Sequence, residues 1–233
     1  MATRLEGHTF RRFDGELYRL NTEILQMADL VYDQVQMALE SFQQQKLDII
    51  RVITERESQV DAMEKSIDNT ITEILAKRCP VARDLRAIMA FSKLVTDLER
   101  LGDEAAKIAH IATTLYNNEH SNPSNYLLRD ITGIGKFACT LLKEAIETLD
   151  ALDLERAEKL LNSHDNLDEE FQAGLRRLTT YVLEDARNVG HIINIVLVMK
   201  SLIRIGEHAR NLAEYVVYMV SGEDIRHTEI EQT

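Results

Sequence analysis

Two short stretches decide the fold of this chain: ERLGDEA at residues 99–105 and IRIGEHA at residues 203–209. Each stretch places a glycine after Arg-Leu or Arg-Ile and before an acidic residue. Outward from both, apolar residues recur at steps of three and four, which is typical of an amphipathic helix. The same residues at the same place in two predicted helices indicate an internal duplication.

A second pair of segments supports the duplication. ALESFQQQKLD at residues 38–48 aligns with AIETLDALDLE at residues 145–155, and Asp61 falls opposite Asp168 in the same register. The offset is 145 − 38 = 107 residues here and 204 − 100 = 104 residues at the glycine motif. A period of this length excludes the usual short solenoid repeats and predicts two bundles packed in tandem.

The composition predicts an all-α protein. Only nine Gly and two Pro occur in 233 residues, so few residues interrupt a helix. Long helices joined by short connections favour antiparallel bundles, and we predict two tandem three-helix bundles. The apolar pattern predicts six helices: 14–45, a second helix ending at 78, a third from after Pro80 to 116, then 125–152, 153–184 and 188–220.

The domain limits follow from one polar segment. Residues 117–124 are rich in Asn and Ser and include Pro123, so they mark a boundary between the halves. We predict a first bundle at 1–117, a second at 124–222 and a C-terminal tail at 223–233.

Charge and apolar content exclude several classes of protein. The net charge of -12 argues against binding to nucleic acid, which needs a cationic surface. The two cysteines show no spacing typical of a disulfide or a thiolate metal site. The N-terminus has no apolar leader, and the longest apolar stretch, 192–199, is too short to span a bilayer. We therefore expect a cytoplasmic protein.

Pairs of acidic residues form the candidate site. Residues four apart share a helix face, so Glu99 and Asp103 present their carboxylates side by side, as do Glu57 and Asp61 on the preceding helix. Like charges at this spacing destabilise a helix by about 0.2–0.5 kcal/mol, which a cation would offset. Oxygen ligands suit hard or borderline cations. With 39 acidic residues in the chain, two solvated acidic faces are the alternative.

A helical wheel of the third helix separates buried from exposed positions. At 100° per residue, Leu98 and Leu101 lie on the buried arc, and Asp97, Arg100 and Glu104 point outward. We therefore expect the last three side chains in solvent.

These segments together resemble the PhoU family. KLVTDLERLGDEAAKIA at residues 93–109 is similar to the family's signature helix, and SLIRIGEHARNLAEYVVYMVSG at 201–222 is similar to its repeat. AKRCPVARDLRAIMAFSK at 76–93 resembles the entry to that helix, and SGEDIRH at 221–227 resembles the family's ending. The resemblance covers nearly the whole chain in the family's order.

The resemblance implies a negative regulator of phosphate uptake and of the phosphate-starvation response, without catalytic turnover. Its implied partners are the ATPase of a phosphate ABC transporter and a membrane sensor histidine kinase, through which it would reach the membrane peripherally. It also implies a homodimer.

The family's acid-x-x-x-Asp motifs imply that the protein binds iron, zinc, manganese or magnesium. Both first-half motifs, Glu57 with Asp61 and Glu99 with Asp103, are intact. In the second half His164 precedes Asp168, Ile203 replaces the expected glutamate, and Glu207 replaces the aspartate. We therefore expect a stronger metal site in the first half and a weak or absent one in the second. These departures also suggest a diverged paralogue of the family.

Two other functions stay open. A metal-free helical adaptor in a separate regulatory pathway has the same helix pattern. A ferritin-like di-metal enzyme needs Glu-x-x-His on two helices, and the sequence contains no such motif.

Overall fold

The computed structural model describes residues 11–44, 48–116, 125–162 and 165–225, and nearly all of them are helical. The all-α prediction is confirmed. The helices are α1 (Arg11–Gln44), α2 (Asp48–Arg78), α3 (Ala82–Tyr116), α4 (Asn125–Ala151), α5 (Leu154–Asn162), α6 (Asp165–Glu184), the 3-10 turn η1 (Ala186–Asn188) and α7 (Val189–Ser221).

The predicted helix at 153–184 is two helices, α5 and α6, on either side of residues 163–164. Leu160 and Leu167 are both buried, so the apolar pattern continues from α5 into α6 and does not distinguish one helix from two. The start of α5 is clearer, because Asp153 Oδ1 accepts a hydrogen bond from the Arg156 backbone N–H at 3.2 Å and so caps the helix. The predicted boundary at 117–124 lies outside the described residues.

The end of α2 follows from the local sequence. Cys79 precedes Pro80, and this position disfavours α-helical backbone. Cys79 adopts a φ of 48°, in the left-handed region, and the chain then turns into α3. α7 ends in a similar way at Gly222, whose φ is 85° and whose N–H donates to the Tyr218 carbonyl at 3.0 Å.

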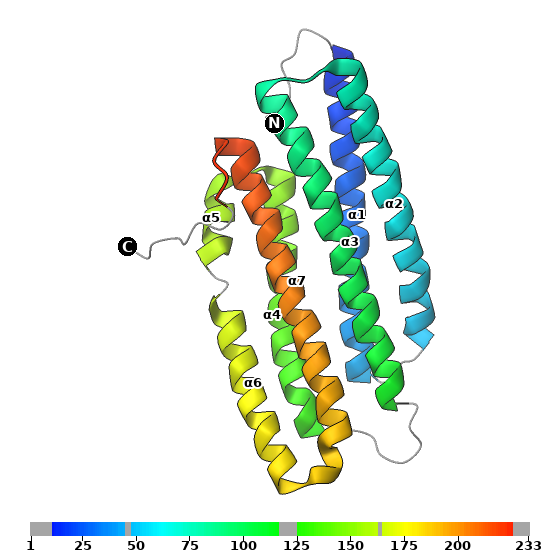
Figure 1. Ribbon diagram of the computed structural model, residues 1–233, viewed down its shortest axis with the longest axis vertical. Coiled ribbons are helices and arrows are strands. Elements are labelled where there is room, and N and C mark those ends of the chain that lie inside the picture. The colour runs from blue at the N-terminus through cyan, green and yellow to red at the C-terminus, as the bar shows by residue number, and fades with distance from the viewer. Residues whose placement is uncertain (1–10, 45–47, 117–124, 163–164, 226–233) are drawn as a thin grey trace.

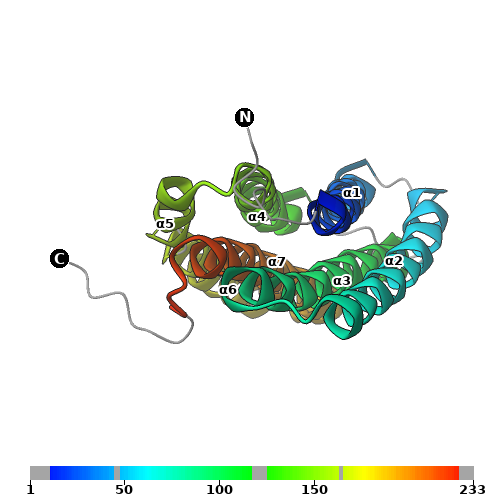
Figure 2. The same cartoon turned by 90° about the horizontal axis from the view of Figure 1, so that it is seen from above.

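The helices form two layers (Figure 2). α1 and α4 lie side by side in one layer, and α2, α3 and α7 form an arc in the other, with α6 along α7. The first bundle consists of α1 to α3 and the second of α4 to α7 (Figure 1). They meet where α3 packs against α7 and α1 against α4.

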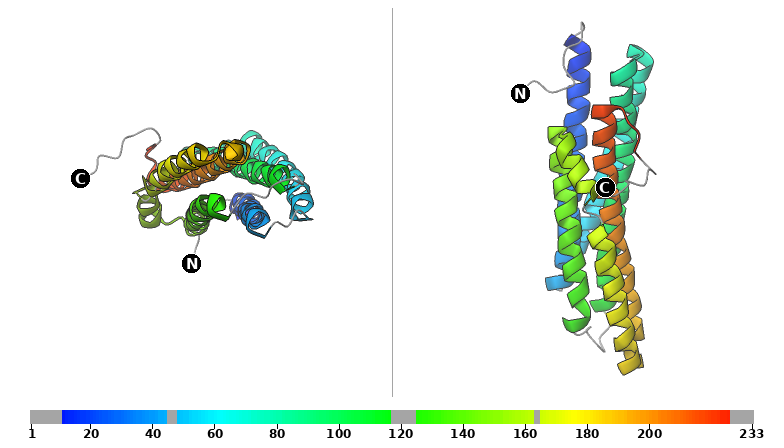
Figure 3. Two further views of the ribbon diagram at one scale, coloured as in Figure 1. Left: turned by 90° about the horizontal axis from the view of Figure 1, so that it is seen from below. Right: turned by 90° about the vertical axis from the view of Figure 1, so that its left-hand side faces the viewer.

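α3 and α7 run antiparallel, and the two bundles are offset from each other along the long axis. The α2–α3 turn lies at one end of the long axis and the α6–α7 turn at the other (Figures 1 and 3). This arrangement is what a two-fold rotation between duplicated halves produces. The two tandem bundles predicted from the sequence are confirmed.

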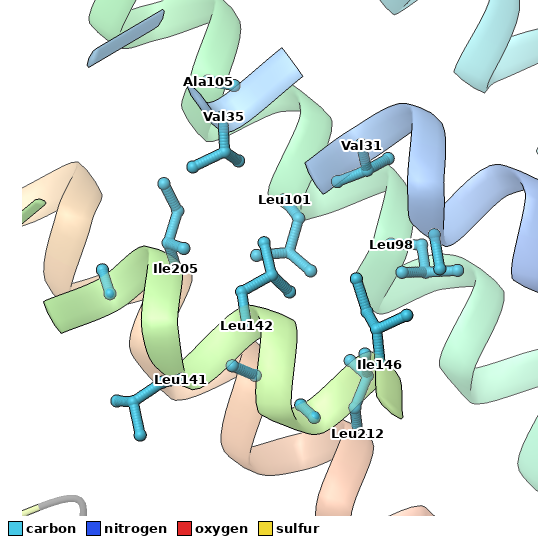
Figure 4. Packing of buried hydrophobic residues seen from close by; sticks show 14 of the residues in the cluster. Val31, Val35, Leu98, Leu101, Ala105, Leu141, Leu142, Ile146, Ile205 and Leu212 are labelled. Carbon is cyan, nitrogen blue, oxygen red and sulfur yellow. The ribbon is translucent and has the colours of Figure 1, made fainter. Parts of the chain in front are cut away.

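One continuous apolar core joins the two bundles. Figure 4 shows side chains from α1, α3, α4 and α7 meeting in it. Leu98 and Leu101 of α3, Leu142 of α4 and Ile205 of α7 are fully buried there. Burial of this apolar surface is the main stabilising term for the contact between the halves.

α7 is also the one helix in the described ranges that is long and apolar enough to cross a bilayer by length and composition. Half of the window that meets this criterion is buried inside the protein. Core helices of soluble proteins meet the same criterion.

Candidate functional site

Carboxylates gather where α2 faces α3. Burial first, and then the charges of Asp103 and Asp61, raise the pKa of Glu57. Burial first, and then Asp103, Glu64 and Asp61, raise the pKa of Glu99. Glu57 of α2 and Asp103 of α3 also line one cavity, so carboxylates of the two helices face each other there. We call Glu57, Asp61, Glu64, Glu99 and Asp103 the acidic cluster.

Glu64 belongs to this cluster and was missed in the sequence. Its pKa is raised by burial and then by Asp68 and Asp61. The signal was present, because Glu57, Asp61 and Glu64 follow one another at steps of four and three on one helix face.

The acidic cluster offers the oxygen ligand atoms and the negative charge that suit a divalent cation. Like charges raise the pKa values of its glutamates, and a bound cation would relieve that repulsion. Within the described ranges, however, no three His, Cys, Asp or Glu side chains are close enough together to hold a metal ion. Lys107 is the nearest cation, with its Nζ 3.8 Å from Asp103 Oδ2.

The second half has no comparable cluster among its described residues. Asp168 lines a surface hollow on α6 with Glu169 and Arg176. Glu207 lies apart from it, in a hollow between α3 and α7 that Asp103 also lines. Ile203 has no ligand atom in its side chain and is buried in the core at 8% exposure. His164, the remaining predicted residue, lies outside the described residues.

A buried polar network joins α3 to α7, and its centre is Asp97. The Tyr215 hydroxyl donates to Asp97 Oδ2 at 2.6 Å, and the Asn211 amide donates to both carboxylate oxygens at 3.3 Å. His208 Nδ1 lies 2.8 Å from Asp97 Oδ1. Burial raises the pKa of Asp97, but the hydrogen bonds from His208, Tyr215 and Asn211 outweigh burial and lower it overall.

The same interface buries a second carboxylate, Glu104. Its Oε1 accepts hydrogen bonds from Lys107 Nζ and Arg204 Nη1, both at 3.0 Å. Burial opposes ionisation of Glu104, and its polar neighbours Ser201, Lys107 and Arg204 lower its pKa nonetheless. Both acids are therefore ionised carboxylates inside the contact between the bundles.

The outward positions expected for Asp97 and Glu104 are wrong. They are only 3% and 4% exposed, whereas Arg100 is exposed as expected. The helical wheel treated α3 as part of a single three-helix bundle. The outer face of that bundle packs against α7, and no periodicity within α3 shows this.

The PhoU domain family model matches residues 24–112 and again residues 131–216. The two matches coincide with the two bundles.

The chain belongs to the PhoU family.

Its curated PhoU relatives match over almost their whole length. The phosphate-specific transport system accessory protein PhoU homolog of Pseudomonas aeruginosa is 37% identical, over 96% of this chain and 91% of that protein. The phosphate-specific transport system accessory protein PhoU of Escherichia coli is 30% identical over the same shares of each chain.

Solved PhoU structures share the fold. The crystal structure of PhoU from Pseudomonas aeruginosa superposes with a TM-score of 0.86 at 36% identity, covering 91% of this chain and 100% of that one. PhoU from Streptococcus pneumoniae, described as a phosphate transport system regulatory protein, superposes with a TM-score of 0.81. Its identity of 21% supports the likeness in fold alone.

Proposed function

We propose that this chain regulates phosphate uptake and represses the phosphate-starvation response by docking on other proteins, without catalytic turnover of its own. The proposed partners are the ATPase subunit of a phosphate ABC transporter and a membrane sensor histidine kinase. The observation that carries the proposal is the match of two PhoU domains to relatives named as accessory proteins of phosphate transport. We place the protein in the cytoplasm as a homodimer.

Duplicated apolar residues on the surface support docking. Leu85 and Met89 on α3 are 39% and 43% exposed, and their equivalents 104 residues later, Val189 and Ile193 on α7, are 38% and 56% exposed. Single exposed apolar residues need no explanation. The same exposed pair at the start of both signature helices is a more specific feature. Because these starts lie at opposite ends of the molecule, the pairs fit two equivalent contact sites, one in each half.

The docking proposal is tested by affinity capture from cells grown in high and in low phosphate. Met89→Lys and Ile193→Lys together place charge in the duplicated pairs, and we expect them to reduce capture of the ATPase and kinase at least tenfold. Tyr18→Lys is the matched control, because Tyr18 is 62% exposed on α1, in the opposite layer. Capture of neither partner by the unmodified chain in either condition would refute the proposal.

We further propose that the acidic cluster binds one divalent cation, of the magnesium, manganese, iron or zinc group. Support comes from the carboxylate ligands and from the repulsion that raises the pKa values of Glu57 and Glu99. Because the described carboxylates are not gathered around a single point, we expect binding to draw them closer together.

The cation is tested by calorimetric titration and elemental analysis of the purified protein. Glu99→Ala should abolish the stoichiometric site, and Asp168→Ala, in the second half, should leave it unchanged. Ile203→Glu restores the carboxylate that the second half lacks. If that absence is the reason for weaker cation binding there, this variant should bind more metal than wild type. The same metal content in wild type and Glu99→Ala would refute this assignment.

One observation favours a metal-free adaptor as the second candidate. The described residues hold no ready-made group of three metal ligands. An adaptor of this kind would contain no stoichiometric metal and would still capture its partners, so elemental analysis alongside affinity capture separates the two candidates.

A further inference from the structure

The duplication relates the two sides of the α3–α7 contact. Adding 104 to a residue number on α3 gives its equivalent on α7, as Gly102 and Gly206 show. By this rule the pair Asp97 with His208 corresponds to the pair Ser201 with Glu104. Asp97 is hydrogen-bonded to His208, and Ser201 and Glu104 line one cavity. The α3–α7 contact therefore contains two places that the duplication relates. We call the place around Asp97 and His208 the first crossing and the place around Ser201 and Glu104 the second crossing.

The first crossing is closed by a tyrosine. The Tyr215 ring lies in the contact at 7% exposure, and its hydroxyl reaches Asp97 Oδ2 at 2.6 Å. Asn211, one turn earlier, donates to the same carboxylate. At this crossing the protein itself supplies an apolar ring and the hydrogen-bond donors that the buried charge requires.

The second crossing lacks these groups. The equivalent of Tyr215 is Ile111, and the equivalent of Asn211 is Lys107. A cavity of about 690 Å³ lies here between α2, α3 and α7, and both Ile111 and Lys107 line it. Ile50, Ile53 and Leu197 contribute apolar wall, and Ser201 and Glu104 lie in the lining with them. A volume of this order is typical of small-molecule sites.

Glu104 is incompletely bonded at this crossing. Lys107 and Arg204 both donate to its Oε1 atom. Its Oε2 atom is buried and has no hydrogen-bond partner. A buried carboxylate oxygen without a donor is costly, so a molecule that brings a donor to it gains binding free energy. The comparable oxygen of Asp97 receives the Tyr215 hydroxyl.

We propose that this cavity binds a small molecule with an apolar body of ring size and an O–H or N–H group that donates to Glu104. The ligand takes the place that Tyr215 fills at the closed crossing. This site goes beyond the proposed regulatory function and does not depend on it. Ligand binding there would add to the contact between α3 and α7 and so strengthen the junction of the two bundles.

The probe for the test is p-cresol, which reproduces the tyrosine side chain, and toluene is its partner without the hydroxyl. Binding is measured by ligand-observed NMR on the full chain. EDTA is present throughout, because Glu57 and Asp103 of the acidic cluster also line the cavity. We expect p-cresol to bind at least about tenfold more tightly than toluene, the effect of one hydrogen bond to a buried charge.

Two variants locate the binding. Leu197→Trp covers the cavity from a position that is 47% exposed, so it should fold and lose p-cresol binding. Ile193→Trp, one turn away at 56% exposure and outside the lining, is the matched control and should bind like wild type. Ile111→Tyr rebuilds the closed crossing, and we expect it to abolish binding and raise the melting temperature.

Three results would overturn the proposal: equal binding of p-cresol and toluene, no binding of p-cresol to wild type, or unchanged binding to Leu197→Trp. If Ile111→Tyr does not fold, the comparison of Leu197→Trp with Ile193→Trp decides alone.

Discussion

The Tyr215 hydroxyl of α7 lies 2.6 Å from Asp97 Oδ2 of α3, and this hydrogen bond joins the two halves of the duplicated chain inside their shared interface. Both residues are buried. The halves are therefore held together by a specific polar contact as well as by the continuous apolar core.

Tyr215→Phe should destabilise the protein by about 1–3 kcal/mol at pH 7, because it removes a donor from a buried carboxylate. The pKa of Asp97 is lowered in the folded state, so its contribution to stability is present above the unfolded value of about 4 and is lost as the pH falls through the folded pKa. Urea unfolding at pH 7 and pH 3 should show the difference between variant and wild type narrowing in acid. Tyr218→Phe in the same helix is the control, and an equal loss in both variants would contradict this role.

Glu57→Gln and Glu99→Gln should each stabilise the protein by about 0.2–0.5 kcal/mol at pH 7 in EDTA, because each removes like-charge repulsion. The folded-state pKa values of both glutamates are raised, so their destabilising effect appears as the pH rises through and above the unfolded value of about 4.3. The advantage of the variants should thus vanish below that pH. Glu40→Gln, exposed on α1, is the control in the same unfolding series. A loss of stability in both cluster variants would show that their charges are compensated in the folded protein.

Gly102→Ala and Gly206→Ala should change stability in opposite directions, although the two glycines are equivalent in the duplication. A Cβ at residue 102 would lie 3.5 Å from Val60 Cγ1, an ordinary contact, so alanine should stabilise α3 by up to about 1 kcal/mol. A Cβ at residue 206 would collide with Cδ2 of Leu167, which is fully buried, and should cost about 1–3 kcal/mol through overpacking. Thermal unfolding of both variants checks the sign, and a stable Gly206→Ala protein would mean that Leu167 repacks freely.

Arg177→Ala should destabilise the second bundle by about 1–3 kcal/mol, because it leaves the carboxylate of Asp130 without its main partner. Asp130 is 6% exposed, and its Oδ1 accepts from Arg177 Nη2 at 2.6 Å and from Nε at 2.9 Å. This pair fixes α6 against α4. Arg176→Ala, an exposed neighbour on α6, should have little effect in the same urea titration. Equal effects of the two variants would show that the loss of charge, and not the ion pair, is responsible.

The sequence by itself determined the duplication, the acidic pairs and most of the helices, but not the division of 153–184 into α5 and α6. The spacing of apolar residues by three and four depends only on residues within one helix. Pro80 ends α2 through its effect on the preceding residue. Both features can therefore be predicted from residues close together in the sequence. The nearness of Glu57 to Asp103 could also be predicted, because α2 and α3 are joined by a short turn and must pack as neighbours.

Only the tertiary structure decided what the outer face of α3 touches. Asp97 and Glu104 have the spacing of solvent-exposed residues, yet α7 covers them, because the second bundle packs there by a two-fold rotation that no helical period encodes. The same packing separates Tyr215, which fills its side of the interface, from Ile111, which leaves a cavity at the equivalent place. Which polar residues are buried depends on contacts between helices about a hundred residues apart, and these contacts form only when the two halves meet.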